Sequence, residues 1–114
     1  MSDTTIIDAA TDTNGWAFGS ADEMEWQQIG EHVSMKLLAI ADGKGIGLFK
    51  FAPGYAGGVH QHLEAEFGFV LEGSVVANGV TLGAGQAYAA QPGTEHHESP
   101  CDGATLLSVF TLPG

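Results

Sequence analysis

Short stretches in which apolar and polar residues alternate, separated by glycine-rich turns, make up most of this sequence. Alternation with a period of two places successive side chains on opposite faces of an extended strand. Asn78-Gly79 lies between two such stretches, and this dipeptide is a strong signal for a tight β-hairpin. The pattern predicts strands over Val33–Ala41, Ile46–Ala52, Phe67–Leu71, Val75–Ala77, Val80–Leu82, Gln86–Ala90 and Ala104–Leu112.

Strands at such regular spacing, with turn residues between them, predict an all-β sandwich or barrel. The length of 114 residues fits a single core. We expect the barrel over residues 31–114, preceded by an N-terminal arm and irregular cover over residues 1–30. The arm is either mobile or an extended strand added to a partner subunit. A helical turn suits only residues 20–26, where Ser20 or Asp22 would cap it.

The stretch Phe67–Leu71 differs from the other predicted strands because both of its faces are apolar. A strand of this kind is buried on both sides, either between two sheets or under a second subunit. Gly73 should end it, since glycine weakens a strand interior. The second apolar face predicts a homodimer.

The charge balance excludes several classes of partner. Three lysines, no arginine and fourteen acidic residues give a net charge of −11 at pH 7. Such a surface repels phosphates, so we expect no nucleic-acid binding and no attachment to anionic membranes. No apolar run approaches the roughly 18 residues needed to span a bilayer, and the N-terminus lacks a secretory signal. The sequence favours a cytoplasmic location and a neutral small-molecule ligand or substrate.

The strongest chemical signal lies in the stretch Gly54–Gly73, between a glycine-rich loop and a β-prone run. His60 and His62 are two residues apart, which places them on one face of an extended strand. Glu66 has the same parity, and the short segment before it can fold back beside them. Two imidazoles and a carboxylate on one face form most of a transition-metal site.

This stretch resembles the first sequence motif of the cupin family: Gly, five residues, His, one residue, His, three residues, Glu, six residues, Gly. Every position is filled, by Gly54, His60, His62, Glu66 and Gly73. The second cupin motif is matched at three positions, Gly85, Gly93 and His96. It departs at Gln91 and Pro100, where the family usually has proline and asparagine. The resemblance covers residues 46–112 and implies a small jelly-roll barrel, also called a double-stranded β-helix.

The cupin resemblance also implies a set of four metal ligands around one divalent ion (Fe, Mn, Ni, Cu or Zn), namely His60, His62, Glu66 and His96. Ligands of these types suit several first-row metals. The neighbouring His97 has the opposite parity to His96 and should point away. Cys101, the only cysteine, is either a buried apolar residue or a reactive thiol.

Aromatic residues of the predicted strands are candidates for the walls of an apolar pocket around the metal, although each could equally be ordinary core. Tyr88 is the best candidate for a polar contact, because a buried hydroxyl needs a partner. Tyr55 lies in the loop before the ligands, where it either gates the opening or packs on its rim. The pocket candidates are Phe49, Phe51, Tyr55, Tyr88 and Phe110.

Two functions from different classes fit the cupin resemblance. The first is a metal-dependent dioxygenase, similar to quercetinases and diketone-cleaving cupins, acting on a small neutral metal-chelating substrate. Cupins that act on phosphosugars, nucleotide sugars or oxalate handle anions, which a chain without arginine suits poorly. The alternative is a metal- or ligand-binding regulatory module without turnover, similar to the cupin domain of ChrR-like anti-sigma factors. Such a module would hold its metal tightly, and zinc is one candidate.

Overall fold

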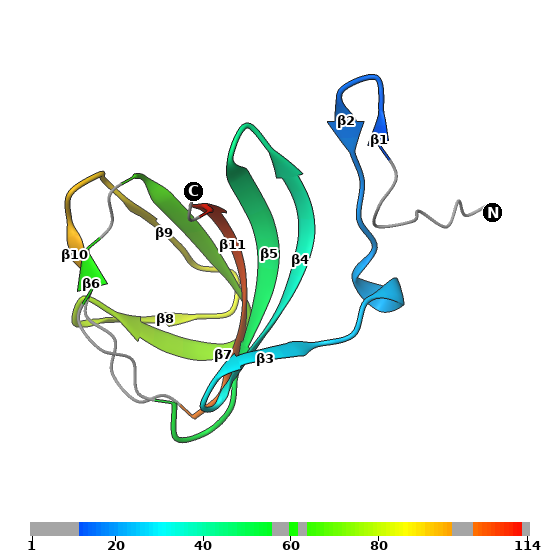
Figure 1. Cartoon of the computed structure of the whole chain (residues 1–114). Coiled ribbons are helices and arrows are strands. Elements are labelled where there is room, and N and C mark those ends of the chain that lie inside the picture. Colours follow the sequence, from blue (N-terminus) through cyan, green and yellow to red (C-terminus); the bar gives the residue numbers. More distant parts are fainter. Residues whose placement is uncertain (1–11, 56–59, 62–63, 97–101, 113–114) are drawn as a thin grey trace.

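The computed structural model describes residues 12–55, 60–61, 64–96 and 102–112. Regular structure in this part is almost entirely β-strand (Figure 1), so the predicted all-β fold class is confirmed. One 3-10 turn, Ala21–Glu23, precedes β3, and no helix among the described residues is long and apolar enough to cross a membrane. The strands are β1 (Asp12–Thr13), β2 (Trp16–Ala17), β3 (Gln27–Gly30), β4 (Val33–Ala41), β5 (Lys44–Phe51), β6 (His60–Gln61), β7 (Glu66–Ala77), β8 (Val80–Gly83), β9 (Ala87–Ala90), β10 (Glu95–His96) and β11 (Ala104–Thr111).

The longer strands form one antiparallel sheet in the order β3-β4-β5-β11-β7-β8, with β9 paired to β7. The C-terminal strand β11 therefore lies between β5 and β7. Figure 1 shows the sheet curving strongly, with β8 and β9 on the side away from β4. A separate ladder of β6 and β10 lies beside them. At the β7–β8 hairpin, Asn78 and Gly79 both have positive φ, as a type I′ turn requires.

The interior of the curved sheet is built from alternate residues of its central strands. Leu106 of β11 lies opposite Phe49 of β5 and Val70 of β7. Val70, Leu106 and Ala104 are the buried apolar residues of the described chain. Strict alternation along β11 thus turns its even-numbered residues inward, toward the region where the predicted ligands should lie.

The outer face of the same sheet is apolar as well. Two successive rows of paired residues cross it, one formed by Ile46, Val109 and Phe67 and the next by Leu48, Leu107 and Phe69. Phe67 and Phe69 are 51% and 41% exposed. An antiparallel sheet that faces water normally carries polar side chains on that face. In the described part of the chain, this outer face therefore stays unusually apolar and half open to solvent.

The prediction that Gly73 ends the strand is wrong, because β7 runs without interruption from Glu66 to Ala77. Up to Gly73 the strand pairs with β11, and from Ser74 it pairs with β8. Gly73 has a φ of 76°, and a Cβ atom there would lie 2.1 Å from the carbonyl oxygen of Gly103. Glycine lets the strand bend here and pass close to the next chain segment without ending.

The N-terminal cover is fastened to the outer face of the sheet through Trp26. The ammonium groups of Lys36 and Lys50 lie 4.8 and 5.4 Å from the centre of the indole ring, within the range of cation–π attraction. Lys36 also donates a hydrogen bond of 2.7 Å to the carbonyl oxygen of Ala21, at the 3-10 turn. The expected helical turn is thus present, with Ser20 at its N-cap position but without a side-chain cap hydrogen bond.

Replacing Gly73 by alanine should cost far more stability than replacing Gly79. Both glycines have positive φ, which costs an L-residue roughly 1–2 kcal/mol. A Cβ atom at Gly79 meets open space, whereas one at Gly73 collides with the backbone of Gly103. We expect a loss of about 1 kcal/mol in the free energy of unfolding for Gly79→Ala and of about 3 kcal/mol or more for Gly73→Ala. Urea denaturation measures both, and equal losses would contradict the steric argument.

Candidate functional site

Two of the predicted metal ligands occupy paired positions in the β6–β10 ladder. His60 of β6 lies directly opposite His96 of β10. Directly opposed residues of an antiparallel ladder have Cβ atoms roughly 5 Å apart on one face of the ladder. The backbone therefore brings together two positions that are 36 residues apart in sequence (96 minus 60). The side chains of both histidines, and all of His62, lie outside the described residues.

The third ligand position, Glu66, begins β7 and carries a carboxylate that is held in place by Tyr88. The Tyr88 hydroxyl donates a hydrogen bond of 2.5 Å to Oε2 of Glu66, and the contact is partly buried. A hydrogen bond from a hydroxyl to a carboxylate is shorter and stronger than one between neutral groups. This contact fixes the orientation of the carboxylate. The polar contact predicted for Tyr88 is thus made with a predicted metal ligand.

A glycine on β7 makes the contact between Tyr88 and Glu66 possible. Gly68 lies directly opposite Tyr88 in the β7–β9 ladder. A Cβ atom at Gly68 would lie 2.4 Å from a carbon of the tyrosine ring, so the ring lies flat against bare backbone. Any larger residue at Gly68 would push the ring away and with it the hydroxyl that holds Glu66. The signal for this role in the sequence is a glycine inside a strand that is otherwise β-prone.

A cavity of about 300 Å³ opens beside Glu66, inside the curved sheet. All five aromatic pocket candidates line it, namely Phe49, Phe51, Tyr55, Tyr88 and Phe110. The Phe49 and Phe110 rings meet edge to face at 5.4 Å between centres, and the Phe51 and Tyr55 rings lie 4.6 Å apart. The other lining residues are Ile29, Val33, Leu106, Ser108 and Thr111. The cavity is therefore an aromatic chamber with the Glu66 carboxylate in its wall.

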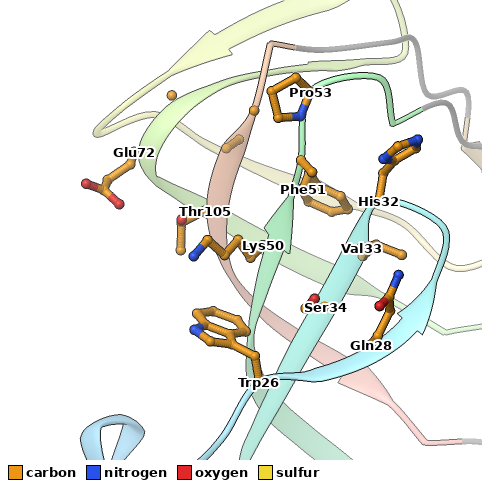
Figure 2. Close-up of a pocket in the computed structure, with 14 residues that line it drawn as sticks. Trp26, Gln28, His32, Val33, Ser34, Lys50, Phe51, Pro53, Glu72 and Thr105 are labelled. Carbon is orange, nitrogen blue, oxygen red and sulfur yellow. The ribbon is translucent and has the colours of Figure 1, made fainter.

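A second, wider groove of about 690 Å³ lies mainly on the outer face (Figure 2). Its floor includes one row of paired residues, Lys50, Thr105 and Glu72. Figure 2 shows the Lys50 side chain beside the Trp26 ring, while the Glu72 carboxylate points away from both. His32 lies at the other end of the groove, near Pro53. The lysine of this groove, Lys50, already contacts the Trp26 ring of the N-terminal cover, so we interpret the groove as a structural junction.

The remaining chemical candidates do not gather elsewhere. Within the described side chains, no three His, Cys, Asp or Glu residues are grouped so that they could hold a metal ion. Glu66 is the one predicted ligand whose side chain is described, and His97 and Cys101 lie outside the described residues. Two features support a metal site: the backbone pairing of His60 with His96, and the Glu66 carboxylate that Tyr88 orients.

A curved antiparallel sheet with such a chamber inside is the jelly roll of the cupins. Residues 15–113 match the sequence model of the ChrR cupin-like domain. The chain therefore belongs to the ChrR cupin-like domain family. No curated protein sequence matches it significantly.

Three solved structures show the same fold. KdgF from a Halomonas species is 25% identical, with 86% of this chain and 96% of that chain covered and a TM-score of 0.74. An RmlC-like cupin from Shewanella frigidimarina is 26% identical, with coverages of 84% and 90% and a TM-score of 0.73. The Rhodobacter sphaeroides complex of SigE with the anti-sigma ChrR contains a chain that is 22% identical, with coverages of 80% and 50% and a TM-score of 0.69. The likeness to this last chain is one of fold.

Proposed function

We propose that this protein binds one divalent transition metal through His60, His62, Glu66 and His96. The observation that carries this proposal is the Glu66 carboxylate, oriented by the Tyr88 hydroxyl and facing an aromatic chamber. Hydrogen-bonded partners of this kind orient ligating carboxylates in metal sites. The pairing of His60 with His96 fits the same arrangement, because it joins two imidazole-bearing positions at one place in the fold. Imidazole and carboxylate together suit Fe, Mn, Ni, Cu and Zn.

The chamber favours a small, uncharged organic molecule as the ligand or substrate. Its lining residues are mostly apolar or aromatic, and no lysine is among them. A carboxylate or phosphate inside would have no cation from these residues to pair with, and burying an unpaired charge is costly. The aromatic walls offer an apolar surface to a bound ligand, and Tyr88 keeps the Glu66 carboxylate in one orientation. These residues therefore bind and orient a neutral molecule.

The reaction that fits such a site is the cleavage of a neutral metal-chelating substrate by dioxygen. A redox-active metal, when bound, would supply Lewis acidity and electron transfer to this chemistry. The protein's own contribution is the aromatic chamber and the carboxylate that Tyr88 holds in place. The protein is thus proposed to be a dioxygenase of small diketone-like or flavonol-like molecules.

The family match supports a second candidate, a regulatory module that binds metal without turnover. The chain belongs to the ChrR cupin-like domain family, and ChrR itself forms a complex with SigE. This chain covers half of the matched ChrR-complex chain. In the second candidate, the same ligands would hold zinc and the chamber would accept a ligand that is not converted.

Metal content tests the site itself. The purified wild-type protein should hold about one equivalent of a first-row metal, measured by elemental analysis after dialysis, and His60→Ala, His96→Ala or Glu66→Ala should abolish it. Tyr88→Phe removes the hydroxyl that donates to Glu66, so we expect it to keep the metal but bind it roughly 10- to 100-fold more weakly. His32→Ala is the matched control, because His32 lies in the outer groove. Metal binding that survives all three ligand substitutions would refute the proposed site.

Oxygen uptake separates the two candidate functions. The protein loaded in turn with iron, copper, nickel, manganese or zinc is mixed with acetylacetone, a flavonol or catechol in an oxygen electrode. Uptake that requires both a redox-active metal and one substrate, and that disappears in Glu66→Ala, is expected of the dioxygenase. Zinc in the protein as isolated, with no uptake under any of these conditions, would instead establish the binding module.

We further propose that the apolar outer face joins two copies of this chain. Its two central rows carry no charged residue. Two chains of net charge −11 repel each other where their acidic residues come close, so an uncharged surface is the part of the protein best suited to self-association. Phe67, Phe69 and Leu71 are each more than two-fifths exposed on β7. An apolar, uncharged surface of this kind can pack against itself across a two-fold axis.

Light scattering after size-exclusion chromatography tests this interface. The wild-type mass should be about twice 11.8 kDa. Phe69→Glu should reduce it to that of one chain, because it buries one carboxylate from each chain in an apolar interface without a cation to pair with. Val80→Glu, at a position that is 58% exposed on β8, is the control and should remain dimeric. A monomeric wild-type mass would contradict the proposal.

A further inference from the structure

A row of three small residues crosses the sheet at the level of the chamber. Ser108 of β11 lies directly opposite Gly47 of β5 on one side and Gly68 of β7 on the other. The inward-facing neighbours of Ser108 along β11 are Leu106 and Phe110, which are much larger. Three adjacent strands thus contribute no side chain bulkier than a hydroxymethyl group at this level. The space above the two glycines is therefore accessible to neighbouring rings, and Ser108 is the member of this row that lines the cavity.

Two aromatic rings border this row of small residues. The Tyr88 ring lies over Gly68, where a Cβ atom would be 2.4 Å from it. The Phe110 ring approaches the other glycine, with a ring carbon 3.4 Å from a Cβ atom built at Gly47. Ser108 is therefore placed between two rings, at a position where a flat ligand would lie.

The Ser108 hydroxyl is buried and lines this chamber. The residue is 3% exposed. Among the residues that the structure describes, none forms a hydrogen bond with its side chain. Burying a hydroxyl without a partner costs roughly 1–3 kcal/mol. Alanine would fill nearly the same volume without this cost, so packing does not explain a serine here.

We infer that Ser108 is a ligand-binding residue whose hydroxyl forms a hydrogen bond with an oxygen atom of the bound molecule. This inference rests on the proposed role of the chamber as a ligand site. Ser108 pairs with Gly68, which is two residues from Glu66 along β7, and such diagonal positions in a ladder are roughly 7–8 Å apart. That separation matches a single six-membered ring with polar groups at opposite ends.

The ligand class follows from these contacts. One end of the molecule faces Glu66 and the proposed metal, the middle is flat and apolar between Tyr88 and Phe110, and the other end carries a carbonyl or hydroxyl oxygen for Ser108. The molecule is uncharged, because no lysine lines the chamber. A hydroxylated or oxo-substituted ring with a chelating group on the opposite edge meets all three conditions.

Phenol and benzene test the Ser108 contact without requiring a metal. They are uncharged rings of nearly equal size that differ by one hydroxyl, and neither chelates. Their dissociation constants are measured by NMR titration of the ¹⁵N-labelled protein. In the wild type, phenol should bind roughly 3- to 10-fold more tightly than benzene, as expected for one hydrogen bond. This preference should disappear in Ser108→Ala and in Ser108→Cys, which keeps the size of the side chain but donates weakly.

Ser34→Ala is the matched control, because Ser34 lines the outer groove, and it should keep the wild-type preference. An unchanged preference in both Ser108 variants, or no phenol binding by the wild type, would overturn the inference. The metal content of the same samples is measured as well. It distinguishes a failure of the Ser108 contact from a failure of the proposed metal site. If the protein holds no metal but still prefers phenol through Ser108, the proposed metal site is refuted and the Ser108 contact is supported.

Discussion

The pairing of β11 with β5 on one side and β7 on the other is the constraint on which the rest of the structure depends. It joins the C-terminal strand to two strands from the middle of the chain, and its register decides which side chains stand side by side. Because Ser108 falls opposite two glycines, the rings of Tyr88 and Phe110 can approach the strand backbone on either side of it. A shift of one residue would turn Glu66 outward and bring Phe67 into the interior. The site is therefore a product of register as much as of residue type.

Much of the fold was readable from the sequence because local signals agreed with one another. The alternation over Val33–Ala41 predicted β4 with its observed bounds, and Asn78-Gly79 predicted the β7–β8 hairpin. The interpretation of Gly73 failed because a glycine signals either a break or a close approach between strands. Only the position of Gly103, thirty residues away in the chain (103 minus 73), distinguishes the two.

The candidate site was predictable in composition but not in its contacts. Ligand types and spacing indicated Glu66, and the aromatic residues of the predicted strands and of the loop before the ligands were the candidates that line the chamber. The hydrogen bond from Tyr88 and the support of its ring by Gly68 depend on the pairing of β7 with β9, which no local pattern specifies. Ser108 was missed for a related reason. A serine in an apolar strand looks unremarkable until its burial and its lack of a partner among the described residues are known.

Charge is distributed so that the scarce cations lie away from the chamber. Lys36 and Lys50 hold Trp26 on the outer face, and Lys44 lies 4.0 Å from the exposed carboxylate of Asp42. Along β7, by contrast, Glu66 and Gly68 serve the chamber while Phe67 and Phe69 form the outer face. The two sets of residues alternate along one backbone, so a substitution that changes the register or path of β7 alters the chamber and the outer face together.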